Sequence, residues 1–293
     1  MAEASVPDIP SGTPCPMCGA SPPDHLAART YNGKTYHLAV CRQCGQHYCD
    51  PPPTSNEIRS FYEGDYHQEL RTIGSTEAVF GEKFVRYRDW ILKFVKPGRS
   101  VDIGTATGML PALLKQVGFQ AEGVEYNRSS AEWGVAHFGV AIRIGGAELV
   151  AQEVAAFDLI TMTDVLEHTE HPLRTLEAMH RSLKPGGFML ITFPDVQSVQ
   201  SRYERLLVKI TRREWLWSCC HIPLHTWEFT TATARRMLQR ASFDVVGFRR
   251  SQVAPDRLTG LPGLLTAPVQ ALTLKPLAET IGTQMEFMIR KLG

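Results

Sequence analysis

The sequence has no excess of charge of either sign. Its 293 residues include 31 lysines and arginines against 30 aspartates and glutamates, a formal net charge of +1. A protein whose main partner is a nucleic acid or an anionic membrane usually carries a broad basic surface, so this balance argues against both classes. The hydrophobic share of 43% and the charged share of 21% are those of an ordinary globular protein.

Long apolar runs are also missing. Residues 1–14 contain acids and prolines but no apolar signal-peptide core, so we expect a flexible tail and a cytoplasmic protein. Leu258–Leu274 carries no charge over 17 residues, but it is shorter than the ~20 residues of a spanning helix, and Pro262 and Pro268 interrupt it. We therefore expect no transmembrane segment and interpret this stretch as part of a lid, which is compatible with peripheral membrane contact.

The seven cysteines do not follow a disulfide pattern, because four of them form two C-x-x-C-G turns, Cys15–Gly19 and Cys41–Gly45. Four thiolates complete a tetrahedral zinc ion and leave no position for a catalytic water. The spacing predicts a structural zinc ribbon over residues 15–50. Its expected ligands are Cys15, Cys18, Cys41 and Cys44, with His47 and Cys49 as possible replacements. A redox pair is the alternative, but a thioredoxin-type motif occurs once and beside a βαβ unit.

A turn built from small residues follows a short apolar strand at Val101–Gly108. Gly104, Ala106 and Gly108 stand at alternate positions, which allows a tight turn and a close approach of the backbone to a ligand. The next segment places leucines and valine with helical spacing, so strand, turn and helix form the first half of a βαβ unit. Twenty-three residues after Asp102, a second strand ends in Glu125, a carboxylate that can accept hydrogen bonds from both hydroxyls of a ribose.

These features resemble those of class I S-adenosylmethionine (SAM) dependent methyltransferases. Val101–Gly108 is similar to the family's D-x-G-x-G-x-G turn, with Ala106 in place of the middle glycine. Phe157–His168 is similar to the family's strand ending in D-V-L-E-H, and Leu183–Gly187 matches its L-K-P-G-G turn. The resemblance covers roughly residues 77–292. It implies an α/β fold with a doubly wound, seven-stranded, mostly parallel sheet, whose last strand, Gln284–Leu292, is antiparallel.

The resemblance also implies a set of residues around the cofactor. The family's usual adenine-binding acid is replaced here by Gly145–Ala147, so either backbone carbonyls with Glu148 or stacking and burial would hold adenine. The aromatic segment Phe61–Tyr66 either covers the cofactor or packs the ribbon onto the main domain. The candidate cofactor contacts are Tyr66, Asp102, Gly104, Ala106, Gly108, Glu125, Tyr126, Ala147, Glu148, Asp164 and Val165.

Four segments make up the predicted domain organisation. Residues 1–14 form a tail, 15–50 the ribbon, 51–76 a linker that covers the cofactor, and 77–293 the methyltransferase domain. We expect lid insertions near residues 196–225 and 255–281 of that domain, and the first of them carries a basic helical face.

Two histidines are candidates for a general base. His168 follows the strand that would pass the reactive sulfur, and His225 belongs to an H-x-x-x-F-T pattern similar to that of ribbon-bearing family members. His168 is equally compatible with a structural role. Cys219, Cys220, His221 and His225 suggest a metal cluster, but Pro223 argues against a helix there, so the sequence does not favour one.

The expected reaction is in-line transfer of a methyl group from SAM to a small-molecule, sugar or lipid-linked acceptor, with oxygen as the favoured atom. RNA is the alternative acceptor, since some methyltransferases of ribosomal RNA combine a zinc ribbon with this fold, although the net charge counts against it. A non-catalytic SAM-binding scaffold is the alternative of another class. The sequence carries no expectation about the oligomeric state.

Overall fold

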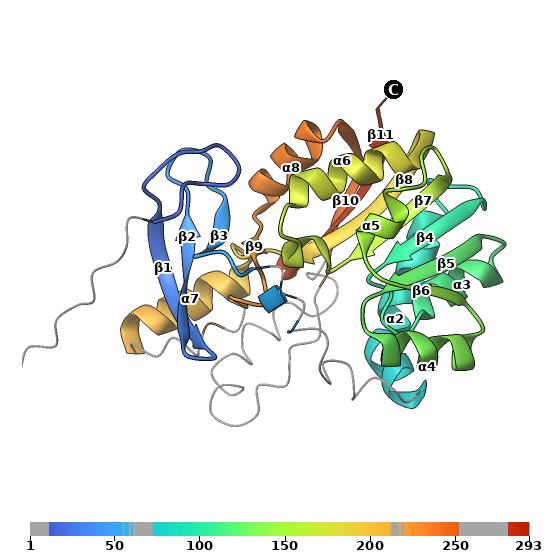
Figure 1. The fold of residues 1–293 in the computed structure, drawn as a ribbon, viewed down its shortest axis with the longest axis horizontal. Coiled ribbons are helices and arrows are strands. Elements are labelled where there is room, and N and C mark those ends of the chain that lie inside the picture. Colours follow the sequence, from blue (N-terminus) through green and yellow to red (C-terminus); the bar gives the residue numbers. More distant parts are fainter. Residues whose placement is uncertain are drawn as a thin grey trace, which may run out of the picture.

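The computed structural model describes residues 12–54, 56–58, 60, 73–211, 217, 220–251 and 281–292, with only the backbone of 73–80. The chain forms two sheets, a small one near the N-terminus and a larger one in the main domain (Figure 1). Tyr66 and the rest of the aromatic segment lie outside the described residues, as do most of 255–281 and the tail up to residue 11.

The larger sheet has seven strands in the order β10-β11-β8-β7-β4-β5-β6. The pairs among β4, β5, β6, β7 and β8 are parallel, whereas β11 runs antiparallel to both β8 and β10. This order confirms the predicted fold class, including the antiparallel last strand. The bounds are β4 Arg99–Ile103, β5 Gln120–Glu125, β6 Ala141–Ile144, β7 Phe157–Thr163, β8 Leu183–Pro194, β10 Phe243–Ser251 and β11 Gln284–Lys291.

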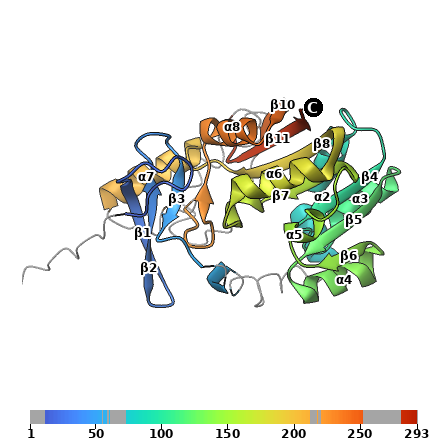
Figure 2. The same cartoon turned by 45° about the horizontal axis from the view of Figure 1, so that its top comes forward.

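Helices cover both faces of this sheet (Figure 2). Consecutive strand residues point to opposite faces, so Leu159 and Leu190 pack with the buried side chains of α2 and α3, while Ile160 and Ile191 pack with those of α6 and α8. The bounds are α2 Ile73–Ile91, α3 Met109–Gln116, α4 Arg128–Phe138, α5 Ala147–Val150, η2 Leu166–His168, α6 Pro172–Ser182 and α8 Thr231–Arg240. Helix α2 ends at Ile91, and a turn connects it to β4.

The N-terminal sheet has the order β1-β2-β3-β9. Its first three strands, β1 Asp24–Tyr31, β2 Lys34–Val40 and β3 His47–Asp50, form a meander. The β1–β2 hairpin turns at Asn32 and Gly33, whose φ angles of 48° and 76° are typical of the two-residue turn that matches strand twist. The fourth strand, β9 Trp227–Glu228, comes from the far end of the chain and pairs with His47 and Tyr48. The main domain therefore completes the N-terminal sheet.

The described part of the first insertion lies against this N-terminal sheet. Helix α7, Val199–Thr211, follows β8, and Val196, Val208 and Trp217 pack in one apolar cluster with Tyr36 and Leu38 of β2. Figure 1 shows α7 running beside β1–β3, away from the seven-stranded sheet. Covering of the crevice by residues 196–225 thus stays a prediction. None of the helices that the structure describes is both long and apolar enough to cross a membrane.

Candidate cofactor and acceptor site

The turn between β4 and α3 adopts a left-handed backbone at every second residue. Gly104, Ala106 and Gly108 have φ angles of 70°, 50° and 78°. Ala106 pays a conformational cost of about 1–2 kcal/mol that glycine would avoid. A Cβ on Gly108 would lie 2.7 Å from Cγ2 of Val140, so the turn packs tightly against the neighbouring strand region. The departure from the family motif at Ala106 thus leaves the shape of the turn intact.

Glu125 connects this turn to the tip of β5. Its Oε2 accepts a hydrogen bond from the backbone N–H of Ala106 and its Oε1 one from that of Asn127, both at 2.8 Å. The side chain is buried, and burial raises the pKa of its carboxyl group. A carboxylate offers about four lone-pair directions. Glu125 can therefore hold the turn and still accept ribose hydroxyls, as the sequence predicts.

Asp102 lies beneath the turn, in β4. Its carboxylate accepts a 2.6 Å hydrogen bond from the Thr161 hydroxyl of β7, and it is 3% exposed. Burial raises the pKa of Asp102 to about 6. The contacts seen for Asp102 tie β4 to β7, and its predicted cofactor contact stays a prediction.

Asp164 directly follows strand β7 and has a φ of 58°. Its carboxylate forms a 2.6 Å ion pair with Lys83 of α2 and accepts hydrogen bonds from Thr192, at 3.0 Å, and Gln284. Burial alone would raise the pKa of Asp164, but Lys83 lowers it below its ordinary value. The next residue, Val165, packs directly on Gly104, where its methyl group occupies the space of a Cβ. The two predicted cofactor segments therefore meet in space.

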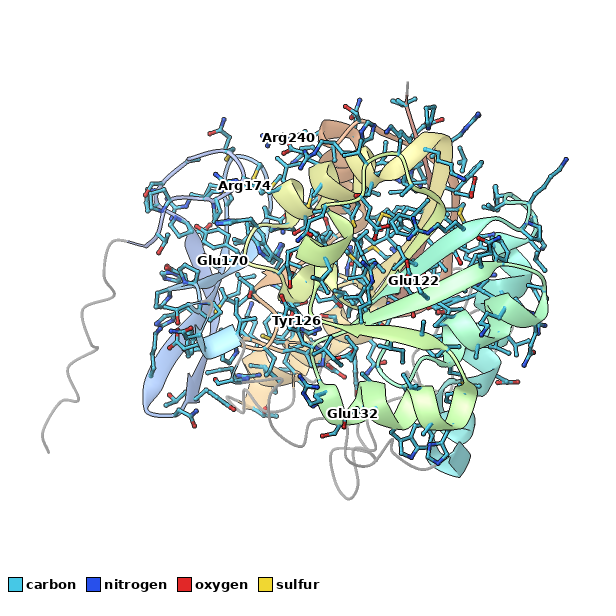
Figure 3. The ribbon with its side chains drawn as sticks, turned by 45° about the vertical axis from the view of Figure 1, so that its right-hand side comes forward. Glu122, Tyr126, Glu132, Glu170, Arg174 and Arg240 are labelled. Carbon is cyan, nitrogen blue, oxygen red and sulfur yellow. The ribbon has the colours of Figure 1, made fainter. Side chains whose placement is uncertain are left out.

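Tyr126, Ala147 and Glu148 meet at the turn after β6, where the usual acid is missing. The Tyr126 hydroxyl donates to Oε2 of Glu148 at 2.9 Å, and the N–H of Gly146 donates to Oε1 at 2.8 Å. The Tyr126 ring lies against Gly146 and is half exposed, beyond the tip of β5 (Figure 3). Ala147 begins α5 directly behind them. The structure thus places a carboxylate, an aromatic ring and a bare backbone where an adenine contact is predicted.

The two base candidates are neighbours. The ring centroids of His168 and His225 lie 4.7 Å apart and the ring planes are inclined by 81°, although 56 residues lie between the two in the chain. Nδ1 of His168 is 2.9 Å from the carbonyl oxygen of Leu224. A carbonyl only accepts, so Nδ1 carries the hydrogen and Nε2 the lone pair of the neutral ring. Burial lowers the pKa of His168 to about 3 and that of His225 to about 4, which keeps both rings neutral near pH 7.

His221 and Glu228 join this pair, a proximity that the sequence did not favour. The N–H of His225 donates to the carbonyl of His221 at 3.1 Å, and this single turn brings the two rings to 4.4 Å without a helix. Glu228 follows in β9, with Oε1 3.2 Å from Nδ1 of His225. Burial raises the pKa of Glu228 to about 7. The H-x-x-x-H-x-x-E spacing was the available signal, and Pro223 does not prevent the turn. Cys220 packs in the apolar cluster beside β2 instead, and Cys219 lies outside the described residues.

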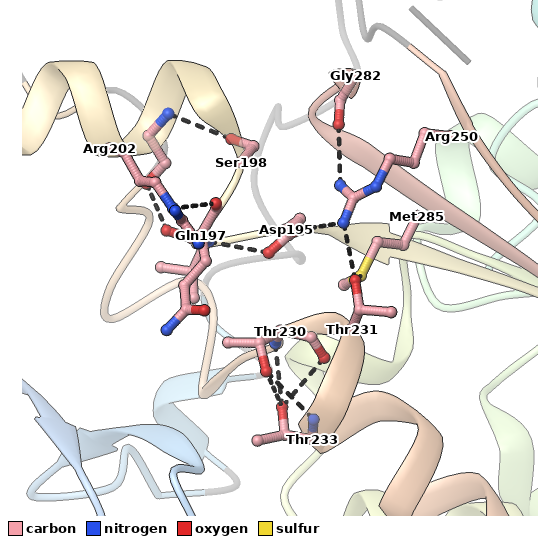
Figure 4. Close-up of polar contacts among 12 residues, drawn as sticks. Asp195, Gln197, Ser198, Arg202, Thr230, Thr231, Thr233, Arg250, Gly282 and Met285 are labelled. Atoms are coloured by element: carbon pink, nitrogen blue, oxygen red, sulfur yellow. Dashed lines mark hydrogen bonds and ion pairs between the residues drawn. The ribbon is translucent and has the colours of Figure 1, made fainter. Parts of the chain in front are cut away.

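The segment that carries these histidines is fixed at both ends (Figure 4). At the end of β8, Asp195 forms a 2.6 Å ion pair with Arg250 of β10 and a bridge with Phe229. After β9, Thr230 caps α8 through a reciprocal pair of hydrogen bonds with Thr233. The position of His225 is therefore set by the main domain as well as by β3.

The four predicted zinc ligands lie together in residues 12–54, which we call the N-terminal subdomain. The sulfurs of Cys15 and Cys44 are 3.6 Å apart and those of Cys18 and Cys41 are 3.5 Å apart, and all four lie within 4.8 Å of one another. Burial works to raise the pKa of Cys41, but backbone N–H groups of Cys44 and Gln43 lower it to about 7. The arrangement fits a metal held by four thiolates. His47 and Cys49 are not among the four, since His47 contacts the Gly45 carbonyl and Cys49 packs in the cluster of β2.

Comparison with known proteins agrees with this geometry. A family model described as a methyltransferase domain matches residues 80–247, which is more than half of the chain. The chain belongs to this methyltransferase family. It is a class I SAM-dependent methyltransferase with a doubly wound sheet.

The similar proteins include methyltransferases of known sequence and structure. A ubiquinone biosynthesis O-methyltransferase of Paraburkholderia phymatum is 26% identical over 65% of this chain and 76% of its own length. One of the same name from Ralstonia nicotianae is 24% identical over 65% and 74%. A SAM-dependent methyltransferase of Thermotoga maritima, described as a possible histamine N-methyltransferase, superposes with a TM-score of 0.53 at 19% identity over 80% of this chain and all of that one. At that identity the superposition shows the fold alone.

Proposed function

We propose that this methyltransferase transfers the methyl group to a hydroxyl oxygen of a small-molecule or lipid-linked acceptor, with His168 as general base. The observation that carries the proposal is the neutral His168 ring, whose Nδ1–H is held by the Leu224 carbonyl at 2.9 Å. The lone pair of Nε2 can accept the hydroxyl proton as the new bond forms. The relatives named O-methyltransferases support oxygen as the acceptor atom.

Bound SAM supplies a methyl group that its sulfonium already activates toward a nucleophile. The chain has to hold the cofactor and the acceptor in line and exclude water, which can supply about 7–11 kcal/mol of the barrier. Glu125 is proposed to accept the ribose hydroxyls, the turn of Gly104, Ala106 and Gly108 to admit the cofactor, and Asp164 and Val165 to flank it. Asp102 braces that turn from below, while Tyr126 and Glu148, with Ala147, offer contacts to adenine.

We also propose that Cys15, Cys18, Cys41 and Cys44 hold a structural zinc ion. Their sulfurs lie close enough for one ion, and a four-thiolate site leaves no position for substrate. The zinc would fix the two C-x-x-C turns, which contact α8. Arg236 and Arg240 of this helix donate hydrogen bonds to the carbonyl groups of Cys44 and Met17.

A methylation assay with labelled SAM and a set of phenols, sugars, lipid-linked alcohols and RNA tests the acceptor class. We expect label in a hydroxyl compound. His168→Gln should lower kcat by about 100-fold or more without changing the Kd of SAM, because only proton removal is lost. His137→Gln is the matched control, because His137 lies in the last turn of α4 and is exposed. Label in RNA, with binding that weakens steeply as salt rises, would establish the alternative acceptor.

A further inference from the structure

Buried carboxylates and imidazoles gather on both sides of His225, outside the four-cysteine cluster. His225 and Glu228 are 7% and 1% exposed, and Glu167, on the other side of His225, is 1% exposed. One ligand atom from each of His221, His225 and Glu228 lies within 4.8 Å of the others. Two imidazoles and one carboxylate facing one point are the donors preferred by divalent first-row metals.

The backbone arranges these donors before any ion is present. One turn, closed by the His225 N–H and the His221 carbonyl at 3.1 Å, presents both rings on the same side. Glu228 is held in β9 by its pairing with His47 and by the Gln46 amide, which donates to its carbonyl at 3.0 Å. The backbone N–H of His221 also donates to Oε1 of Glu228, at 3.1 Å. Ligands on an anchored strand and a tight turn lose little conformational freedom when a metal binds.

The carboxylates provide an independent sign of a missing partner. Oε2 of Glu228 and both carboxylate oxygens of Glu167 are buried without a hydrogen-bond partner among the described residues. Leaving such an oxygen unsatisfied costs about 1–3 kcal/mol, and more when it is charged. A divalent cation beside His225 would satisfy this oxygen of Glu228.

We propose that His221, His225 and Glu228 form a second metal site, which binds a divalent first-row ion such as Zn²⁺ through two imidazoles and one carboxylate. Metal–ligand bonds of about 2.0–2.2 Å in a tetrahedral site place the ligand atoms about 3.3–3.6 Å apart. The three ligand atoms lie within 4.8 Å of one another, so binding requires them to approach by about an ångström, which side-chain rotation can supply. The site does not depend on the identity of the methyl acceptor.

The ion would serve two purposes in this chain. Coordination occupies the lone pair of His225, which leaves His168 as the remaining base of the pair. It also joins the turn at His221 to β9, the strand that completes the N-terminal sheet. Metal bound here would therefore stabilise the junction between the N-terminal subdomain and the main domain.

Cobalt substitution separates this site from the four cysteines. Metal-free full-length protein is titrated with Co²⁺, because cobalt bound to thiolates gives an intense ultraviolet charge-transfer band and cobalt bound to imidazole and carboxylate does not. We expect two equivalents to bind, with the thiolate band saturating at one. His221→Ala and Glu228→Gln should each lose one equivalent and keep the full thiolate band.

His171→Ala is the matched control, since this histidine precedes α6 and its side chain is 57% exposed. It should retain both equivalents. The thiolate band and far-ultraviolet circular dichroism report folding of each variant. The proposal is overturned if wild-type protein binds a single equivalent, or if folded His221→Ala and Glu228→Gln both keep two. Should both variants unfold, the wild-type titration decides, because a second equivalent without added thiolate absorption still requires a site of nitrogen and oxygen donors.

Discussion

The turn after β4 and the histidine cluster at β9 are both built from buried polar groups, yet they are assembled in different ways. Around the turn, Glu125 reaches Ala106 across 19 residues, and the parts belong to one βαβ unit. At the cluster, His168 and His225 are 57 positions apart in the chain, and β9 pairs with a strand about 180 residues earlier. The first region is local in sequence and rests on backbone geometry. The second depends on how the N-terminal subdomain docks, so the two should respond differently to mutation.

The largest expected effect concerns the docked subdomain. Cys41→Ser should abolish metal binding by the four cysteines and unfold β1–β3, because structural zinc sites contribute on the order of 10 kcal/mol to folding. SAM affinity should change little, since the turn lies in the other sheet. Zinc analysis, limited proteolysis and calorimetry with SAM measure the three effects. Cys49→Ser, a buried cysteine outside the cluster, is the control, and a parallel loss of SAM binding in Cys41→Ser would show that the two regions are not separable.

Glu125→Gln should weaken SAM binding and leave the N-terminal subdomain folded. The amide cannot accept the N–H bonds of both Ala106 and Asn127, and it loses the charge that we expect the ribose hydroxyls to meet. Because one hydrogen bond to a charged group contributes about 1.5–3 kcal/mol, loss of a bond to a ribose hydroxyl should raise the Kd for SAM by about 10- to 100-fold. Calorimetry checks this, with Glu132→Gln on the exposed face of α4 as the control. An unchanged Kd would remove Glu125 from the cofactor site.

Asp102 predicts a dependence of stability on pH. Its folded pKa of about 6 exceeds its ordinary value of 3.8, so the folded state holds the proton more tightly than the unfolded state. The stability linked to this proton is complete below pH 3.8 and is lost as the pH rises to 6. Asp102→Asn has no carboxyl group to titrate, so between pH 4 and pH 7 the free energy of unfolding of the wild type should fall by about 2 kcal/mol relative to that of the variant.

Urea unfolding across that range measures the difference. Asp158→Asn is the counterpart, because Asp158 is partly buried but Lys184 and the Arg99 N–H lower its pKa. The free energy of unfolding of Asp158→Asn should fall relative to that of the wild type as the pH rises through the acid range. Equal slopes for the two variants would contradict the burial of Asp102.

The smallest expected effect compares two glycines with left-handed backbones. Gly108→Ala and Gly139→Ala should each lower the free energy of unfolding by about 1 kcal/mol, because the φ angles at these positions are 78° and 62°. At Gly108 the new Cβ would also meet Val140 and Ile142 within 3 Å, whereas no atom lies within 4 Å at Gly139. We expect Gly108→Ala to be the less stable variant by a further 1–3 kcal/mol in denaturant unfolding. Similar free energies of unfolding for the two variants would mean that the turn can move to accommodate the new methyl group.

The difference between the two regions also explains what could be predicted from sequence. The order of strands and helices followed from local patterns, such as the apolar run of β7 and the small residues between β4 and α3. The packing of α7 on the N-terminal sheet could not be derived, because its amphipathic face does not say which partner it meets. Two residues, Trp227 and Glu228, are too few to show a strand period, so β9 came only from the fold. The spacing of His221, His225 and Glu228 is visible in the sequence, but the turn that brings the two rings together is not.

The pairing of β9 with β3 has a consequence for how the protein is made. When residues 12–54 leave the ribosome, β3 has an open edge, and its partner strand emerges only after more than 170 further residues. An open strand edge is prone to pair with other chains. The N-terminal subdomain is therefore a poor candidate for expression by itself or for grafting onto another enzyme, because the strand that closes its edge belongs to the main domain.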